Sequence, residues 1–190
     1  MTQTIDITTR KELDIYMNPQ RQRILKCLSV NSQPMTPKQL SNELGISASA
    51  VTFHLKKLES IGVVELDHTE MIRGIQAKYY KRTPAVVNLR GSVQDDLKEE
   101  KTVLLDYLMN DIWNGFKEYL SGLKDMPKED EVHGDASNGI LYLTKEEAKQ
   151  AMDLILSFQK NHQEPREGTE PWEYAVIAYP KNRSEEEGDS

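Results

Sequence analysis

The stretch from residue 36 to residue 62 constrains the fold most, because it holds start and stop signals for two consecutive short helices. The sequence TPKQ at 36–39 combines a capping threonine, a proline in the first helical turn and a glutamine that can complete a capping box. Gly45 ends this first helix, since glycine readily adopts the left-handed conformation that closes a helix. Ser47 then caps a second helix over 48–60. The spacing therefore predicts two helices joined by a tight turn.

The segments on either side extend this pair into a larger unit. A preceding helix runs from Leu13 or Asn18 to Ser29, with apolar residues at helical spacing, and residues 1–10 are expected to form a short flexible arm. After the pair, residues 63–66 and 75–81 are β-prone, and an Arg-Gly step at 73–74 suits a hairpin tip. The predicted order is helix, helix, turn, helix and a two-stranded wing.

The second half of the chain predicts a different organisation. A long helix over 92–123 is followed by a charged loop, a strand at 139–143, a helix opened by a capping box at 144–147, and a strand at 172–179. Two strands do not make a stable sheet alone, so we expect them to pack on the long helix or to gain strands from a second subunit. The tail, 181–190, is predicted to be disordered.

The fold class predicted is mainly α with small β (α+β), in two parts. Residues 1–90 form a winged helix-turn-helix, and residues 91–190 form a dimerisation region that either completes a dimer or receives an effector. The dimerisation residues that we expect on the long helix are Leu105, Leu108, Ile112, Phe116, Tyr119 and Leu123.

The charge distribution supports this division. The net charge is −7, which taken alone argues against a nucleic-acid partner. Residues 1–90, however, hold 13 Lys and Arg against 8 Asp and Glu, a balance of +5, while residues 91–190 hold 11 against 23, a balance of −12. Such asymmetry indicates a basic binding module joined to an acidic body. Chance clustering is the alternative reading.

One face of the helix over 48–60 is expected to stay free and to enter the major groove of double-stranded DNA. Small, hydroxyl and cationic side chains there can contact base edges and phosphates. A basic wing tip suits the minor groove. The predicted DNA-binding residues are Thr36, Lys38, Ser47, Ser49, Ala50, Thr52, Phe53, His54, Lys56, Lys57, Arg73 and Lys78. For the lysines a solvated surface is the competing reading, and for His54 a solvated side chain or a backbone contact.

The run LSNELGISASAVTFHLKKLESIGVVELDHTEMIRGIQAKYYKRT, residues 40–83, resembles the winged helix of the arsenical-resistance-repressor (ArsR)-like regulators. The resemblance covers about residues 15–85. It implies a homodimer whose two recognition helices, residues 47–57, read two half-sites, with residues 63–82 as the wing. The second half looks like the extension found in some larger relatives.

Metal sensing of the kind used by small members of that family is not supported. The segment TPKQLSNELG at 36–45 has no cysteine and the helix over 92–123 has no histidine, whereas soft metals need thiolates and zinc wants several nitrogen or sulfur ligands. The single cysteine, Cys27, reads as a small buried apolar residue, and the histidines at 54, 68, 133 and 162 offer no close pair. We therefore predict no metal and no cofactor.

Other chemistry is equally unsupported. No nucleophile paired with a base and no glycine-rich phosphate loop occurs, so the chain is not predicted to be an enzyme. No apolar run approaches the roughly 18 residues that span a bilayer, and MTQTIDITTR lacks an apolar signal core, so we expect a cytoplasmic protein. Aromatic residues of the second half read either as core and dimer contacts or as the lining of an effector pocket: Trp113, Phe116, Tyr119, Tyr142, Trp172, Tyr174 and Tyr179.

Two functions of different class remain at this point. The first is a DNA-binding transcriptional regulator that binds a two-fold symmetric operator as a homodimer. The second is a winged-helix protein-interaction module without sequence-specific DNA binding, since fold does not fix function.

Overall fold

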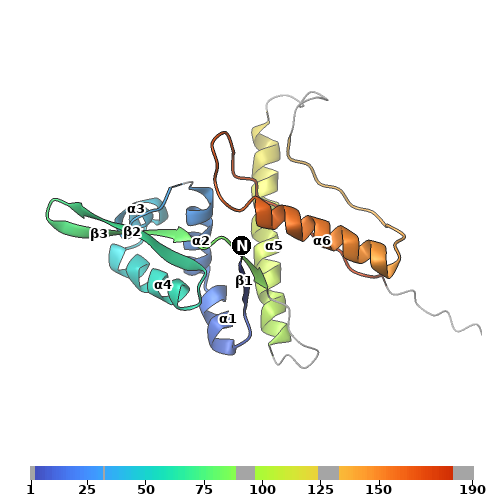
Figure 1. Ribbon diagram of the computed structural model, residues 1–190, viewed down its shortest axis with the longest axis horizontal. Coiled ribbons are helices and arrows are strands. Elements are labelled where there is room, and N and C mark those ends of the chain that lie inside the picture. Colours follow the sequence, from blue (N-terminus) through green and yellow to red (C-terminus); the bar gives the residue numbers. More distant parts are fainter. Residues whose placement is uncertain (1–2, 32, 89–96, 124–132, 182–190) are drawn as a thin grey trace, which may run out of the picture.

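The computed structural model describes residues 3–31, 33–88, 97–123 and 133–181, which form six helices and four strands (Figure 1). In chain order these elements are β1 (Gln3–Asp6), α1 (Arg10–Met17), α2 (Pro19–Val30), α3 (Pro37–Leu44), α4 (Ala48–Ser60), β2 (Val64–Ile72), β3 (Ile75–Arg82), β4 (Ala85–Asn88), α5 (Lys98–Gly122) and α6 (Lys145–Asn161). The mainly α, α+β winged-helix class predicted from the sequence is confirmed.

The N-terminal residues differ from the flexible arm that was predicted. Residues 3–6 form strand β1, which pairs in parallel with β4 from Gln3 opposite Ala85 to Asp6 opposite Asn88. Ile7, directly after the strand, is almost completely buried in the core. The arm was predicted because its partner strand lies some eighty residues away, and a local pattern does not reveal such a pairing.

The predicted first helix is two helices that meet at Asn18. The Asn18 side chain accepts hydrogen bonds from the backbone N–H groups of Gln20 and Arg21, so it caps α2. The Arg21 guanidinium is buried and donates to the backbone carbonyls of Asp14 and Ile15 at the end of α1. Asn18 and Arg21 thus bind free backbone groups of both helix ends at the bend, and Gln22 adds a hydrogen bond to the Tyr16 carbonyl.

The core lies where α1 to α4, the wing and the start of α5 meet. Leu40 of α3 and Leu55 of α4 are fully buried, and Leu104 of α5 is nearly so. Burial of each such leucine stabilises the fold by about 1.5–3 kcal/mol relative to exposure. The same core also contains Leu13, Tyr16, Ile24, Leu25, Leu28, Met35, Val51, Leu58, Val63, Val64, Tyr80 and Leu97.

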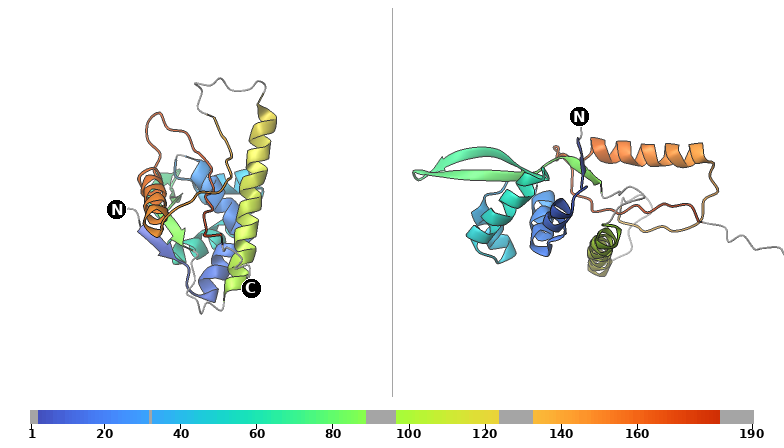
Figure 2. Two further views of the ribbon diagram at one scale, coloured as in Figure 1. Left: turned by 90° about the vertical axis from the view of Figure 1, so that its right-hand side faces the viewer. Right: turned by 90° about the horizontal axis from the view of Figure 1, so that it is seen from below.

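The wing is an antiparallel hairpin of β2 and β3, longer than predicted at its first strand. Its base is anchored because Tyr80 is buried and exchanges two backbone hydrogen bonds with Met35. Its tip is the predicted Arg73-Gly74 step, where both residues have positive φ, 50° and 80°. Positive φ at both central positions is the geometry of the two-residue turn that matches strand twist. Figures 1 and 2 show the hairpin projecting beyond α3 and α4.

The second half follows the prediction for its helices and departs from it for its strands. Helix α6 begins at the predicted capping box, and α5 is observed from Lys98, while residues 92–96 of the predicted helix lie outside the described residues. Residues 139–143 and 172–179 are not strands: each is extended chain with no strand partner. Neither segment joins one of the two sheets of the described chain, β1–β4 or β2–β3. The predicted tail, apart from Lys181, lies outside the described residues.

Helix α6 projects away from the winged helix, on the opposite side of the molecule from the wing (Figures 1 and 2). Its residues are exposed or half-buried along its whole length. Across the ranges that the structure describes, no helix is both long enough and apolar enough to cross a membrane.

Candidate DNA-binding interface

Helix α4 is oriented by its buried face. Val51, Leu55 and Leu58 recur at helical spacing and are completely buried, so the rotation of the helix about its axis is fixed. At its start the Ser47 hydroxyl accepts a hydrogen bond from the Ala50 N–H. The opposite face of α4 is consequently turned to solvent.

The turn before α4 is held by side chains as well as by its glycine. Gly45 has φ 68° and closes α3 in the left-handed conformation. The Ser41 hydroxyl donates to the Ile46 carbonyl at 2.7 Å, and Arg23 of α2 donates to the Leu44 carbonyl at 3.1 Å. These contacts fix α4 against α3, so the free face of α4 has a defined direction.

The free face of α4 presents hydroxyl, aromatic and cationic groups. Ser47 and Ser49 are exposed, with their hydroxyl oxygens 3.1 Å apart. The Phe53 ring is 55% exposed, and the Lys57 ammonium lies 5.7 Å from its centroid, at cation–π distance. Lys56 is exposed, and no carboxylate of the described residues lies within ion-pair distance of either lysine.

Three of the predicted residues are more enclosed than their neighbours. Ala50 is half-buried, and the half-buried Thr52 donates its hydroxyl hydrogen to the Ala48 carbonyl at 2.8 Å, which leaves its methyl group and an acceptor lone pair for other contacts. His54 is half-buried as well, and its Nδ1 has no hydrogen-bond partner among the described residues. Burial lowers the pKa of His54, and the positive charge of Arg21 lowers that pKa further.

The start of α3 contributes one exposed cation. Thr36 is half-buried and its side chain is engaged in the capping box with Gln39, whose backbone N–H donates to the Thr36 hydroxyl at 3.2 Å. Lys38, one residue into the helix, is exposed. Thr36 therefore has a structural role in the helix start, while Lys38 is available to a partner.

The wing holds paired and unpaired cations. Lys81 lies 2.8 Å from Asp67 and 3.4 Å from Glu65, and its hydrogen bond is the main cause that lowers the pKa of Asp67. Arg73 at the tip and Lys78 on β3 are exposed, and neither lies within ion-pair distance of a carboxylate in the described part of the chain. Those two are thus the wing cations that a phosphate backbone can use.

The residues predicted for dimerisation do not share one environment. Leu108 packs against the core of its own chain. Leu105, Tyr119 and Leu123 are exposed, and Ile112 and Phe116 are half-buried. In the single chain, most of this set forms an uncovered apolar strip along α5.

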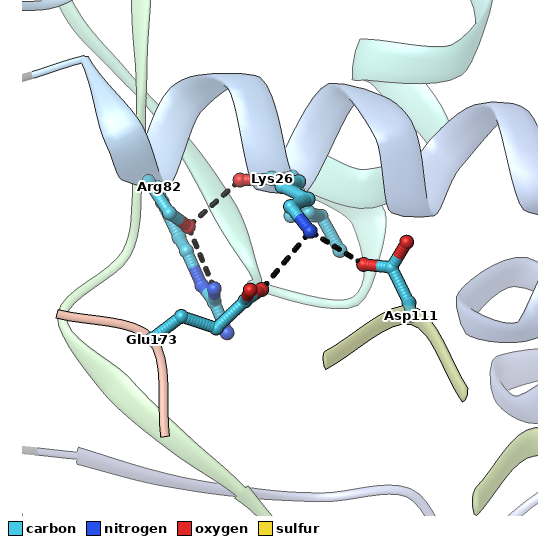
Figure 3. Close-up of polar contacts among 6 residues, drawn as sticks. Lys26, Arg82, Asp111 and Glu173 are labelled. Atoms are coloured by element: carbon cyan, nitrogen blue, oxygen red, sulfur yellow. Dashed lines mark hydrogen bonds and ion pairs between the residues drawn. The ribbon is translucent and has the colours of Figure 1, made fainter. Parts of the chain in front are cut away.

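An ion-pair cluster that sequence reasoning missed joins the two halves. Lys26 of α2 contacts Asp111 of α5 and Glu173 of the C-terminal extended segment, and Arg82 at the base of the wing donates to Ser29 nearby (Figure 3). These residues are separated by as much as 147 positions in the sequence, so no local pattern signals the contact. Also missed were the apolar side chains at the wing tip, which alternation along β2 and β3 could have indicated.

Within the described ranges, no group of three or more His, Cys, Asp or Glu side chains is placed to hold a metal ion. Cys27 is half-buried, with its sulfur 3.9 Å from that of Met35, and burial is the main cause that raises the pKa of its thiol.

The fold and the free face of α4 define the class of the N-terminal half, a winged helix-turn-helix DNA-binding domain. In agreement, residues 17–65 match the family described as winged helix-turn-helix DNA-binding. The DNA binding that the sequence predicted is thereby confirmed for this domain.

Solved structures similar to this chain share little sequence with it. The Adhesin competence repressor (AdcR) of Streptococcus pyogenes is 15% identical, with 79% of this chain and 83% of that chain covered and a TM-score of 0.33. The heme sensor protein PefR of Streptococcus agalactiae, in complex with heme, is 17% identical, with 80% of each chain covered and a TM-score of 0.31. A mutant of Lactococcus lactis ZitR in apo form is 17% identical, with 80% and 88% covered and a TM-score of 0.29. No curated protein matches the chain.

Proposed function

We propose that this protein is an ArsR-like regulator that binds a two-fold symmetric operator as a homodimer, with α4 as the recognition helix. The observation that supports the proposal most directly is the free face of α4, where Lys56 and Lys57 lie beside hydroxyl groups and have no carboxylate partner in the described chain. Cations that are not paired with a carboxylate are available to neutralise phosphates and release counterions.

The proposed division of contacts follows from which groups are free. Lys38, Lys56, Lys57, Arg73 and Lys78 contact phosphates or, at the wing tip, the minor groove. Ser47, Ser49, Ala50, Thr52 and Phe53 face the base edges in the major groove. His54 lies half-buried on the same helix, where burial and the charge of Arg21 lower its pKa, and contributes through its ring. Thr36 acts through the capping box that holds the start of α3.

The homodimer is supported by apolar surface that one chain leaves uncovered. Along α5 the exposed or half-buried strip comprises Leu105, Ile112, Phe116, Tyr119 and Leu123. In the extended segments, Leu141 is 80% and Tyr142 is 88% exposed. A protein seldom exposes contiguous apolar surface of this kind unless another surface covers it. A second copy offers the same apolar strip, and strand partners for residues 139–143 and 172–179.

In this proposal residues 1–90 bind DNA and residues 91–190 dimerise and receive a small-molecule effector, with no enzymatic activity. The dimer holds two recognition helices about 34 Å apart, one turn of the duplex. An effector acts by binding more tightly to the dimer with one spacing of its recognition helices than to the dimer with another spacing. Only such a difference in affinity shifts the equilibrium between the two arrangements. In this proposal the protein acts in the cytoplasm.

The test of DNA binding is a salt titration. Full-length protein is mixed with a fluorescent duplex selected from a random-sequence pool, and the dissociation constant is measured from 50 to 300 mM KCl. The double variant Lys56→Gln, Lys57→Gln should bind every duplex more weakly and flatten the log–log salt slope by about 1 to 2 units. A matched control, Lys145→Gln with Lys149→Gln on α6, also removes two exposed lysines and should bind like the wild type.

An unchanged slope in the α4 variant would reject these phosphate contacts. If the wild type retains no duplex even at low salt, the protein-interaction reading of the winged helix replaces the proposal. Sedimentation equilibrium tests the dimer separately: the wild type should have twice the chain mass, and Tyr142→Glu should shift it toward a monomer. A monomeric wild type would overturn the dimer.

A further inference from the structure

The tip of the wing is unusually apolar for a surface so far from the body of the protein. Ile75 is 74% exposed, Met71 is 64% exposed and Ile72 is 44% exposed. The hairpin projects beyond α3 and α4 (Figures 1 and 2), and the strand register places these residues next to its turn. No other described segment covers them, so their exposure is not explained by the fold.

The strand register places these residues on both faces of the tip. Ile72 and Ile75 are opposite each other next to the turn, so they share one face of the hairpin. Met71 is opposite Gln76 and lies on the other face, because successive side chains of a strand alternate. Arg73 lies in the turn between them. The tip is therefore a narrow wedge with an apolar side chain on each face and a cation at its end.

The charges around the tip favour a polyanion as its partner. Arg73 and Lys78 have no carboxylate within ion-pair distance among the described residues. The nearest acidic side chain along β2, Glu70, accepts a hydrogen bond from the Tyr79 hydroxyl at 3.1 Å. Asp67, deeper in the wing, is paired with Lys81 at 2.8 Å. The tyrosine hydroxyl does not neutralise Glu70, so this end of the wing carries two cations and one carboxylate, a net charge of 2 − 1 = +1.

A cation flanked by apolar side chains on a thin projection matches the minor groove of a duplex. That groove is narrow and concentrates negative potential, which attracts an inserted arginine. Its walls are sugar C–H groups, and apolar side chains that enter it wedge between base steps and bend the duplex. An apolar protein partner would not explain the exposed charge of Arg73. A purely electrostatic contact with DNA would not explain the two exposed isoleucines.

We infer that Met71, Ile72 and Ile75 form an apolar wedge that enters the minor groove beside Arg73 and bends the DNA. This inference rests on the proposed DNA-binding function and adds a site to it. Pyrimidine–purine steps unstack most easily, so the wedge gives preference for such steps at the position of each wing. The preference arises from deformation of the duplex rather than from hydrogen bonds to bases.

The test uses full-length protein and the duplex that the wild type selects from a random-sequence pool. The double variant Ile72→Thr, Ile75→Thr keeps the β-branched shape and strand propensity while making both side chains polar. Binding is measured by fluorescence anisotropy, and bending by energy transfer between dyes on the two duplex ends. The control is Val30→Thr, an exposed valine at the end of α2 that lies outside the wing.

The expected result is binding about tenfold weaker, a smaller bend and an unchanged salt slope, because the lost contact is apolar. Arg73→Gln should instead reduce the salt slope by about 1 unit. Wild-type affinity and bend in the isoleucine variant would overturn the wedge while leaving the DNA-binding function intact. If the wild type selects no duplex, the DNA-binding function itself fails and the wedge fails with it.

Discussion

Lys26 on α2 lies with its ammonium nitrogen 2.7 Å from a carboxylate oxygen of Asp111 on α5, so one ion pair ties the winged helix to the long helix. The same nitrogen lies 3.1 Å from Glu173, which brings the C-terminal extended segment to this point (Figure 3). Burial opposes the charge of Lys26, but the hydrogen bonds that its ammonium group donates to both carboxylates outweigh burial and raise the pKa of the lysine. A contact between the two halves is what an effector signal would need to reach the recognition helix.

Removal of the Lys26 charge should loosen this junction with little loss of global stability. The Lys26 and Asp111 side chains are 43% and 45% exposed, and exposed ion pairs contribute at most about 1 kcal/mol. We therefore expect Lys26→Met to change the free energy of unfolding by less than that, while amide hydrogen exchange near Asp111 becomes faster. The control, Lys38→Met, removes an exposed lysine of α3. Identical exchange rates in α5 for both variants would show that the contact does not hold the halves together.

A pH dependence of stability should arise from His54. Its pKa is lowered in the folded state by burial and by the charge of Arg21, whereas the unfolded chain keeps the ordinary value of about 6.5. At pH values below that, the unfolded state binds more protons than the folded state, so stability falls as the pH decreases. The loss begins near pH 6.5 and ends below the folded-state pKa.

Urea denaturation measured at intervals from pH 8 to pH 5 checks this expectation. The variant His54→Gln should lose the part of the slope that lies below pH 6.5, because glutamine takes up no proton in this range. His162→Gln, which removes an exposed histidine of the second half, is the control. If the slope persists in His54→Gln and disappears in His162→Gln, the pH dependence of stability arises in the second half of the chain and not at His54.

The fold could be predicted from the sequence wherever a few neighbouring residues decide the conformation. The capping threonine, Gly45 and Ser47 set the ends of α3 and α4, and the Arg73-Gly74 step set the wing tip, because capping and turn geometry are local. The pairing of β1 with β4 was missed because Gln3 meets its partner only across the intervening domain. Strands were predicted at 139–143 and 172–179, and the single chain has none there, since apolar alternation does not say where a partner strand comes from.

The sequence predicted which face of α4 forms the candidate site, but not the contacts that individual side chains make within it. The three-residue and four-residue spacing of Val51, Leu55 and Leu58 identifies the side of α4 that stays free. It does not show that the hydroxyl of Thr52 is bonded to the Ala48 carbonyl, or that His54 lies near Arg21. Those contacts depend on side-chain rotamers and on helices from another part of the chain.

The two faces of α4 should respond differently to truncation. Leu55 is completely buried, so Leu55→Ala should lower the free energy of unfolding by about 2–5 kcal/mol through the lost contacts and the cavity left behind. Phe53, two residues earlier, is 55% exposed, and Phe53→Ala should leave stability nearly unchanged while weakening DNA binding. Chemical denaturation and a DNA-binding titration of both variants provide the measurement. Equal stability losses would mean that α4 is rotated from the orientation described.

The turn before α4 should need Gly45 for its backbone conformation, and not because a larger side chain would clash there. A methyl group at Gly45 would meet no atom within 4 Å, but its φ of 68° is one that other residues adopt at a cost of about 1–2 kcal/mol. We expect Gly45→Ala to lower the free energy of unfolding by that amount, measured by urea denaturation.

Gly122, at the end of α5, also has open space around it and is absent from the positive-φ residues, so Gly122→Ala is the matched control. In that position alanine should be neutral or stabilising because of its higher helix propensity. If Gly45→Ala costs no more than Gly122→Ala, the left-handed turn does not fix the angle between α3 and α4, and the Ser41 and Arg23 hydrogen bonds must do so instead.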